Sequence, residues 1–328
     1  MGRFEFIDHG AASEVYTEMA AHEVFSGGKD HPVYGNVGRN YYAIALGEAS
    51  LDLAFVVTDN GGPVLLVQCA LRDTELSHFG FPIRFNFAAG LPPTAQRKSL
   101  NAAFEKIGQI AAEHSATEAF LSAGPPTGSL GLIDKACLDR DGKPGLRIRA
   151  EADLELSGEE LKSDLRSSYK SLINWGRDNI RLEYVNAANP DRLLLEKLSD
   201  FHAQTAGRIV HAQPTWDELF RQISIGHGEI SMGFAQDGEL VAGTMVIDEG
   251  PTALYFLAVY DRERFEKPIG HWPLFDAMVR AKNRGLRRFD LGEVHARGTV
   301  EPKEFNIGFF KKGFTSRLVT ETVWRVPL

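Results

Sequence analysis

Two adjacent lysines near the end of the chain, Lys311 and Lys312, are the residues whose setting most strongly indicates chemistry. They lie in "FNIGFFKKGF" (305–314), among four phenylalanines. A segment this apolar normally packs in a core, and a core rejects unpaired charge. Either the two lysines cap a solvated turn, or one of them points into a cleft to meet negative charge. If the segment is extended, its successive side chains face opposite ways and the two lysines cannot share one role.

Other polar residues stand where they could contact phosphate or move a proton. Lys29 and Arg39 lie in a loop rich in glycine, asparagine and tyrosine over 26–42, and on their chemistry alone they are candidate phosphate contacts. Asp290 and Glu293 stand at the end of a strand-like run, "RFDLGE", where a carboxylate is able to accept a proton.

The composition predicts a globular, soluble protein with room for two domains. The chain has 328 residues, of which 43% are hydrophobic and 24% charged. Its formal net charge of −8 argues against a DNA-binding surface that extends over the fold. Two cysteines without CxxC spacing, no apolar leader and no long apolar run together predict a cytoplasmic protein without a transmembrane segment.

Several well-known motifs are absent from the sequence. The ten histidines show no HExxH or paired Cys/His spacing, so no metal site is expected. The Gly-Gly-Lys at 27–29 lacks both the earlier glycine and the following Ser or Thr of a Walker loop. There is no GxGxxG between a strand and a helix, and no GxSxG elbow. NTPase, dehydrogenase and hydrolase functions are therefore disfavoured.

Hydrophobic periodicity predicts an α/β (α+β) protein with two similar halves. In the first half we expect helices over 13–25 and 91–114, strands over 51–58, 63–71, 116–124 and 146–157, and a hairpin turn at 60–62. In the second half we expect helices over 158–179, 191–206, 216–224 and 271–284, and strands over 229–236, 239–248, 252–260, 286–292 and 317–326. Ser157 and Glu160 form a capping box, which places a domain boundary between residues 1–156 and 157–328. The repeated element order indicates two copies of one unit, each a mixed central sheet flanked by helices.

Four segments of the second half resemble the FemAB family of peptidoglycan-bridge aminoacyltransferases and their GNAT relatives. These segments are "SSYKSLINWGRDNI", "FHAQTAGR", "IGHWPLFDAMVRAKNRGLRRFDLG" and "IGFFKKGF". Each is weakly specific alone, and their order carries the match. The resemblance implies tandem GNAT-like domains, with the acyltransferase domain in residues 157–328. It also implies transfer of an acyl or aminoacyl group to an amine of a cell-wall or surface-glycan precursor, without a metal.

The resemblance also implies roles for particular residues. The T-x-x-R motif falls on Thr205 and Arg208, and the arginine would contact substrate phosphate. The F-K-x-G-F motif falls on 310–314, and Lys311 would sit at the reacting carbonyl. A cation there contributes about 3 kcal/mol of transition-state stabilisation. Asp290 is the candidate base, although a structural acceptor role is the simpler one. Tyr255 would border the acyl channel, or else pack in a core.

The chain departs from both donor patterns known for this superfamily. The acetyl-CoA loop, R/Q-x-x-G-x-G/A, corresponds to "DRERFEKPIGHW", which offers only Arg264 and Gly270 for a pyrophosphate. No heptad run exists for the coiled-coil arm that binds tRNA in some members. Five basic residues over 162–181 either form a solvated helix face or steer an RNA or phosphate-bearing donor. The donor therefore stays open between acyl-CoA and aminoacyl-tRNA.

Three functions follow from these residues. The first is a FemAB-like acyl- or aminoacyltransferase acting on a small-molecule or nucleotide-linked acceptor. The second is a CoA-dependent N-acyltransferase acting on an amino sugar or small amine. The third is a GNAT-like module that binds its ligand without turnover. The oligomeric state is left open.

Overall fold

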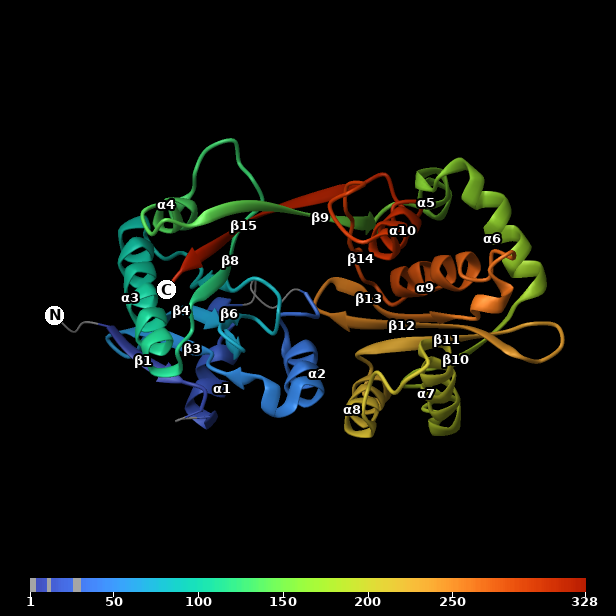
Figure 1. Cartoon of the computed structure of the whole chain (residues 1–328), viewed down its shortest axis with the longest axis horizontal. Helices are drawn as coiled ribbons and strands as arrows, with labels where there is room; N and C mark the ends of the chain where they lie inside the picture. Colours follow the sequence, from blue (N-terminus) through green and yellow to red (C-terminus); the bar gives the residue numbers. More distant parts are fainter. Residues whose placement is uncertain (1–3, 11–12, 26–30) are drawn as a thin grey trace. The chain divides into compact units, whose positions relative to one another are not determined.

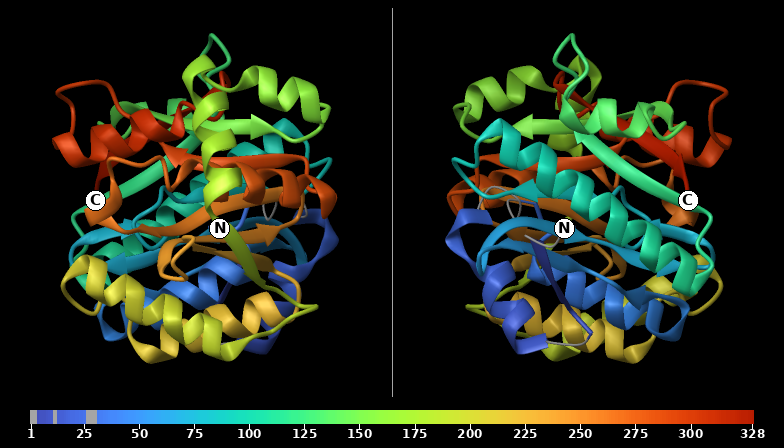
Figure 2. Two further views of the ribbon diagram at one scale, coloured as in Figure 1. Left: turned by 90° about the vertical axis from the view of Figure 1, so that its right-hand side faces the viewer. Right: turned by 90° about the vertical axis from the view of Figure 1, so that its left-hand side faces the viewer.

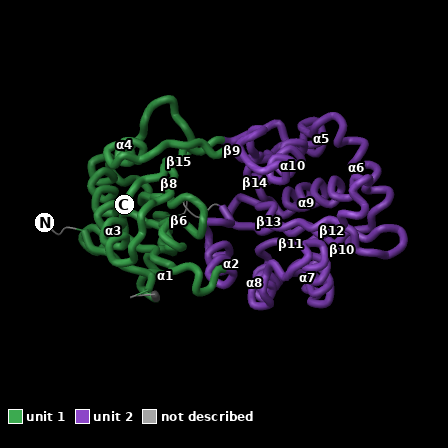
Figure 3. The backbone as a smooth tube through the Cα atoms, viewed as in Figure 1, with its two compact units in different colours: residues 1–29, 46–147, 320–328 green, residues 30–45, 148–319 purple. Residues whose placement is uncertain are grey.

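The computed structural model describes residues 4–10, 13–25 and 31–328 and divides the chain into two compact units (Figure 3). Unit 1 comprises Met1–Lys29, Leu46–Arg147 and Thr320–Leu328, and unit 2 comprises Asp30–Ala45 and Ile148–Val319. The units thus do not follow the single boundary at 156/157 that the capping box indicated. Residues 30–45 join unit 2 early, and the last strand returns to unit 1. Local sequence patterns do not indicate that either segment belongs to the other unit.

The described residues of unit 1 form strands of two sheets together with α-helices (Figure 1). These strands and helices are β1 (Phe4–Asp8), α1 (Ser13–Ala21), the 3-10 helix η2 (Gly47–Ala49), β2 (Leu51–Asp52), β3 (Phe55–Asp59), β4 (Gly62–Gln68), β5 (Ala70–Arg72), β6 (Glu75–Ser77), β7 (Arg84–Phe87), α3 (Pro93–His114), β8 (Glu118–Gly124) and α4 (Leu132–Leu138). Two strands, β9 (Lys143–Asp153) and β15 (Leu318–Pro327), have residues in both units. One sheet has the order β1-β3-β4-β7, and β15, β8, β6, β5 and β2 follow one another in the other.

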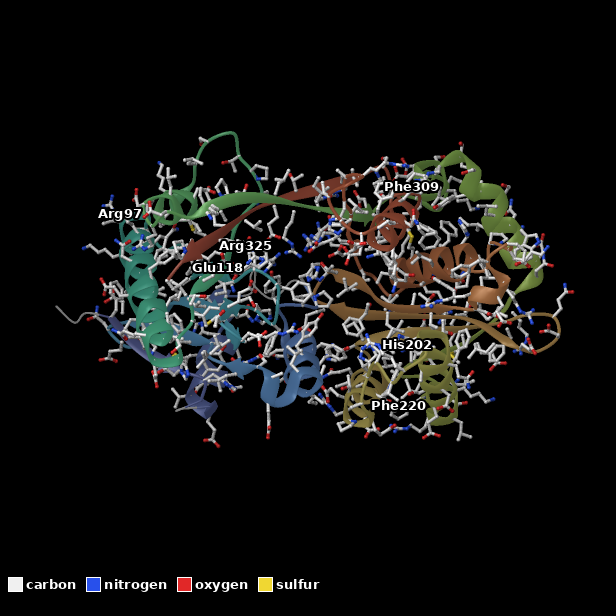
Figure 4. All side chains as sticks on the ribbon, in the orientation of Figure 1. Arg97, Glu118, His202, Phe220, Phe309 and Arg325 are labelled. Atoms are coloured by element: carbon white, nitrogen blue, oxygen red, sulfur yellow. The ribbon has the colours of Figure 1, made fainter. Side chains whose placement is uncertain are left out.

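The core of unit 1 forms where α3 covers β3 and β4. Leu100 and Ile107 of α3 are fully buried against Phe55 and Leu65 of these strands. The predicted turn between β3 and β4 is confirmed, since Asp59 pairs with Gly62 and the two turn residues between them adopt positive φ. On the neighbouring strands β15 and β8, Arg325 and Glu118 form an ion pair (Figure 4).

Unit 2 is built on one mixed sheet in the order β10-β11-β12-β13-β14-β9. Its elements are α2 (Asn36–Leu46), α5 (Gly158–Asp164), α6 (Ser167–Asn179), β10 (Arg181–Val185), α7 (Arg192–Ala206), α8 (Gln213–Ser224), β11 (Gly228–Phe234), β12 (Leu240–Glu249), β13 (Thr252–Tyr260), the 3-10 helix η3 (Arg262–Arg264), α9 (His271–Asn283), β14 (Arg288–Glu293) and α10 (Pro302–Lys311). The mixed sheet flanked by helices confirms the predicted fold class.

Helices cover both faces of the sheet of unit 2. Helices α7 and α8 lie side by side on one face, and α9 lies on the other (Figures 1 and 2). Leu198 of α7 and Trp216 of α8 pack with Met245 of β12 in one apolar cluster. Met278 of α9 packs with Phe289 of β14 in another. Because both faces are covered, the central strands are almost continuously buried.

The parallel neighbours β13 and β14 pair over only three residues. Thr252, Ala253 and Leu254 pair with residues 288–290. Beyond Leu254, β13 continues to Tyr260 without pairing to β14, so the two strands part. An extra residue in β13, Phe256, breaks its register with β12 just where the strands begin to part. The sheet is therefore open on this side, and ligand space forms there.

Several predicted elements need correction. The helix expected over 158–179 is two helices, α5 and α6, so the five basic residues do not share one helix; Arg181 lies in β10, which was not predicted. Helix α8 begins at Gln213, with Pro214 in its first turn, and so starts earlier than the helix expected over 216–224. The lysine segment is helical and not extended, since α10 runs from Pro302 to Lys311. Across the described residues, no helix has both the length and the apolar character needed to cross a bilayer.

A buried carboxylate, Glu229 of β11, holds α9 to the sheet. Arg280 contacts both of its oxygens, and Arg284 Nη1 lies 3.3 Å from Oε1. Replacing Glu229 by alanine removes the carboxylate that binds Arg280 and leaves Arg284 with Asp248 alone, so we expect a loss of about 3 kcal/mol in unfolding free energy. Glu155→Ala removes the exposed pair with Arg287 and is the matched control, with a loss below about 1 kcal/mol. Urea unfolding of both variants checks this, and equal losses would contradict it.

Candidate functional site

An open cleft of about 1130 Å³ lies in unit 2 along the unpaired part of β13. Its walls are Tyr255–Tyr260 of β13, the end of α7, the segment 262–271 and the inner side of α10. The cleft thus occupies the side of the sheet on which β13 and β14 part. Its volume is at the upper end of what small-molecule sites offer.

The charge of the cleft is opposite to that of the chain. Its charged lining residues are all cationic: Arg208, Arg262, Lys267, Lys303 and Lys311. No aspartate or glutamate is among the described residues that line it. The first four side chains are exposed, and within the described part of the chain none of them forms an ion pair. In a protein of net charge −8, such a cleft attracts an anionic ligand.

Lys311 ends α10 and is half-buried at the cleft. Its ammonium lies against Gly292, where the Cβ of any other residue would come within 2.7 Å of Nζ. Gly292 also has φ +90°, so both its backbone and this close approach require glycine. Burial lowers the pKa of Lys311, and the negative charges of Asp290 and Glu293 oppose that shift. Lys312 does not line the cleft, because the helix turns it away from its neighbour.

The carboxylate of Asp290 is buried and engaged by neighbouring groups of the protein. It is 1% exposed, and Oδ2 lies 2.6 Å from Arg149 Nη1 and 2.6 Å from His31 Nε2. The backbone N–H of Gly292 donates to its other oxygen at 2.8 Å. Burial would raise the pKa of Asp290, but Arg149, His31 and the Gly292 amide outweigh it and hold the pKa well below its usual range. The catalytic role expected for Asp290 does not fit this environment, because a carboxylate so stabilised binds a proton poorly.

Four other predicted site residues lie at the cleft. Thr205 and Arg208 line it from the end of α7, Tyr255 from β13 and Gly270 from the start of α9. The hydroxyl groups of Tyr255 and Tyr260 are 2.8 Å apart, and burial raises the pKa of both. At Gly270 a Cβ would lie 2.9 Å from the ring of Tyr260, so this glycine is needed for packing as well as for a helix start.

The remaining predicted residues are not brought to the cleft. Arg264 forms ion pairs with Asp237, Glu239 and Asp261 and does not line the cleft, so the pyrophosphate contact expected of it is not supported. Arg39 lies in α2, also away from the cleft lining. Lys29 lies outside the described residues.

The sequence analysis did not identify three cationic lining residues and two histidines, one of which is His202 of α7. Arg262, Lys267 and His271 come from the segment whose poor glycine content argued against a phosphate loop, and Lys303 from the start of α10. Their only signal was an excess of basic side chains around Arg264. Among the described residues, no group of three or more histidines, cysteines or carboxylates is placed to hold a metal ion.

Aromatic packing fixes the end of α10. The Tyr169 ring lies so close to Gly313 that a Cβ there would come within 2.0 Å of its Cε2. The Tyr169 hydroxyl donates to the carbonyl of Phe310 at 3.2 Å, and its ring meets Phe314 edge-on at 5.1 Å between centroids. The glycine of the F-K-x-G-F motif therefore makes room for a ring that positions Lys311.

We expect Gly313→Ala to displace Tyr169 and to reduce the unfolding free energy by about 1–3 kcal/mol, as overpacked sites do. Gly108→Ala in α3 is the control, since a Cβ there meets nothing within 4 Å and alanine favours helix. Thermal unfolding of both variants measures the difference. An unchanged melting temperature for Gly313→Ala would show that the Tyr169 ring moves freely.

Comparison with known proteins identifies a recognised domain in unit 2 that contains the cleft-lining residues between 202 and 271 but not those of α10. A family model described as the acetyltransferase (GNAT) domain matches residues 163–298, which lie within unit 2. No curated protein matches the chain in sequence.

Solved structures extend the similarity over the whole chain. FemX aligns with a TM-score of 0.67 at 10% identity, covering 99% of this chain and 97% of its own. A tandem GNAT protein from the clavulanic acid biosynthesis pathway aligns with a TM-score of 0.58 at 14% identity, covering 99% and 98%. L-PGS from Bacillus licheniformis aligns with a TM-score of 0.53 at 14% identity, covering 80% of each chain. The GNAT-like fold predicted from the sequence is thus confirmed: residues 163–298 match the acetyltransferase (GNAT) domain, and the whole chain shares its fold with FemX and with a tandem GNAT protein.

Proposed function

We propose that this protein transfers an acyl or aminoacyl group from a phosphate-bearing donor to an amine of a cell-wall or surface-glycan precursor. The observation that carries the proposal is the half-buried ammonium of Lys311, held against Gly292 in a cleft whose described lining has no carboxylates. Similarity in fold to FemX supports the same chemistry.

The role of Lys311 follows from the charge that develops during amide formation. The amine nitrogen attacks the ester or thioester carbonyl, a C–N bond forms, and the carbonyl oxygen becomes negative. When the bond from carbon to the leaving oxygen or sulfur breaks, the oxygen loses that charge again. A fixed ammonium in a partly dry site stabilises the charged stage more than the substrate. Aromatic side chains around the end of α10 keep Lys311 in place and exclude water.

Phosphate recognition falls to the exposed cations at the cleft. Arg208 is free to bind a phosphate through two N–H groups, since in the described residues no carboxylate engages it. Arg262 and Lys267 lie on the segment before α9, and Gly270 and His271 open that helix toward the cleft. A helix N-terminus with neighbouring cations favours an anion.

Acyl-CoA is the second candidate donor, and the start of α9 favours it. The GNAT domain match covers this helix, and CoA carries phosphates that suit the cations beside it. An aminoacyl-tRNA donor would use the same cations through its backbone phosphates. The chemistry at Lys311 is the same for either donor.

Ligand binding should depend on Arg208 but not on Arg264. We expect acetyl-CoA, a long-chain acyl-CoA, or a UDP-linked amino sugar to raise the melting temperature, because a ligand at about 100 times its Kd adds about 2.7 kcal/mol. Arg208→Ala should reduce the shift, since it removes a phosphate contact. Arg264→Ala, which breaks only ion pairs outside the cleft, should retain it. A shift that survives Arg208→Ala unchanged would contradict phosphate binding there.

Transfer should depend on Lys311 but not on Lys312. With the donor and acceptor that give a thermal shift, we expect Lys311→Ala to lower kcat by about 100- to 1,000-fold with little change in KM, as loss of an oxyanion donor does. Lys312→Ala is the matched control, because the two lysines are adjacent and only Lys311 lines the cleft. Equal rates for the wild type and Lys311→Ala would refute the proposed role. Binding without any transfer would leave only a binding module.

A further inference from the structure

His271, the first residue of α9, lines the same cleft as Lys311. Its ring meets Phe310 edge-on at 5.2 Å between centroids. Phe310 directly precedes Lys311 in α10, so the imidazole and the ammonium border the same space. Tyr169 encloses the imidazole from another side, with ring centroids 4.5 Å apart.

The hydrogen-bond partner of Nδ1 determines which ring nitrogen of His271 carries the hydrogen. Nδ1 lies 3.4 Å from the carbonyl oxygen of Pro268, which can only accept a hydrogen bond. Nδ1 therefore carries the hydrogen in the neutral ring, and Nε2 carries the lone pair. Within the described part of the chain, no donor binds Nε2. An imidazole oriented by a carbonyl through one nitrogen leaves the other nitrogen ready to accept a proton.

The surroundings of His271 favour its neutral form. Burial lowers the pKa of His271 below its usual value; the hydrogen bond with Pro268 opposes this, and the charge of Arg166 adds to it. The phenol of Tyr169 also lies against the ring, Tyr260 and Lys311 line the same cleft, and no carboxylate is among the described residues that line it. The helix N-terminus at which the ring stands also disfavours a positive charge. His271 is therefore a base that is available at neutral pH.

We propose that Nε2 of His271 is the general base that takes the proton from the acceptor amine. The inference rests on the proposed function. As the amine nitrogen bonds to the acyl carbon, its proton passes to Nε2. When the bond to the leaving oxygen or sulfur breaks, the imidazolium returns that proton to the leaving atom. Asp290 cannot fill this role, because Arg149 and His31 already bind its buried carboxylate.

The decisive test is the pH dependence of transfer by His271→Asn, whose amide can still donate to the Pro268 carbonyl. Acetyl-CoA with glucosamine is the first substrate pair, followed by the pairs that shift the melting temperature. Wild-type kcat/KM should fall as the pH drops through the lowered pKa of His271, because protonation blocks the base. We expect His271→Asn to be about 100- to 10,000-fold slower and to lose this acid limb, with partial rescue by added imidazole. His227→Asn is the control, a histidine of unit 2 that does not line the cleft.

The outcomes separate this inference from the proposed function. If the wild type catalyses transfer and His271→Asn is equally fast, or keeps the acid limb of the pH profile, His271 is not the general base. The proposed transferase function would still hold in that case. No transfer by the wild type with any pair would overturn both. NMR of the protein labelled with ¹⁵N-histidine gives a readout that needs no turnover. We expect a neutral Nδ1–H tautomer at pH 7, and an Nε2–H tautomer or a charged ring would overturn the assignment. An unchanged melting temperature of His271→Asn shows that the variant folds.

Discussion

The parting of two parallel strands is the constraint on which the structure of unit 2 depends. β13 and β14 pair over three residues and then separate, and an extra residue in β13 begins the separation. Backbone groups that part in this way must find other partners or face ligand and water. The cleft follows β13, while β14 carries Asp290 and Gly292, and the ammonium of Lys311 lies against Gly292. The site is thus a consequence of how the sheet opens.

Two kinds of charge serve different purposes around this opening. Asp290 and His31 are buried and Arg149 is partly buried, and the three side chains bind one another, so they stabilise the local backbone. The cations of the cleft lack such partners among the described residues and remain available to a ligand. A cation that is already paired with a carboxylate of the protein attracts an anionic substrate less strongly than an unpaired cation does. Arg149 and His31 are thus bound by a carboxylate and anchor the local structure, whereas within the described chain no carboxylate binds the exposed cations of the cleft, which can bind a ligand.

Glycines near the site are required because a neighbouring side chain occupies the place of a Cβ, and at Gly292 also because of the backbone conformation. Gly292 admits the ammonium of Lys311, Gly270 admits the Tyr260 ring, and Gly313 admits the Tyr169 ring. Because glycine has no Cβ, each of these positions leaves space that a lysine or aromatic side chain fills. The F-K-x-G-F motif therefore contains both the lysine and the glycine whose lack of a side chain allows the Tyr169 ring to pack beside it.

The sequence by itself determined most helices and strands, the hairpin at 60–62, the GNAT-like fold and the motif positions of Thr205, Arg208 and Lys311. These follow from local periodicity, turn chemistry and ordered motifs, which neighbouring residues carry. Only the tertiary structure decided that residues 30–45 and 320–328 change units, that Arg264 is engaged by carboxylates, and that Asp290 is an anchor. It also decided that His271 and Lys311 line one cleft. These facts depend on residues up to 259 positions apart, as with His31 and Asp290, and no local pattern records such pairings.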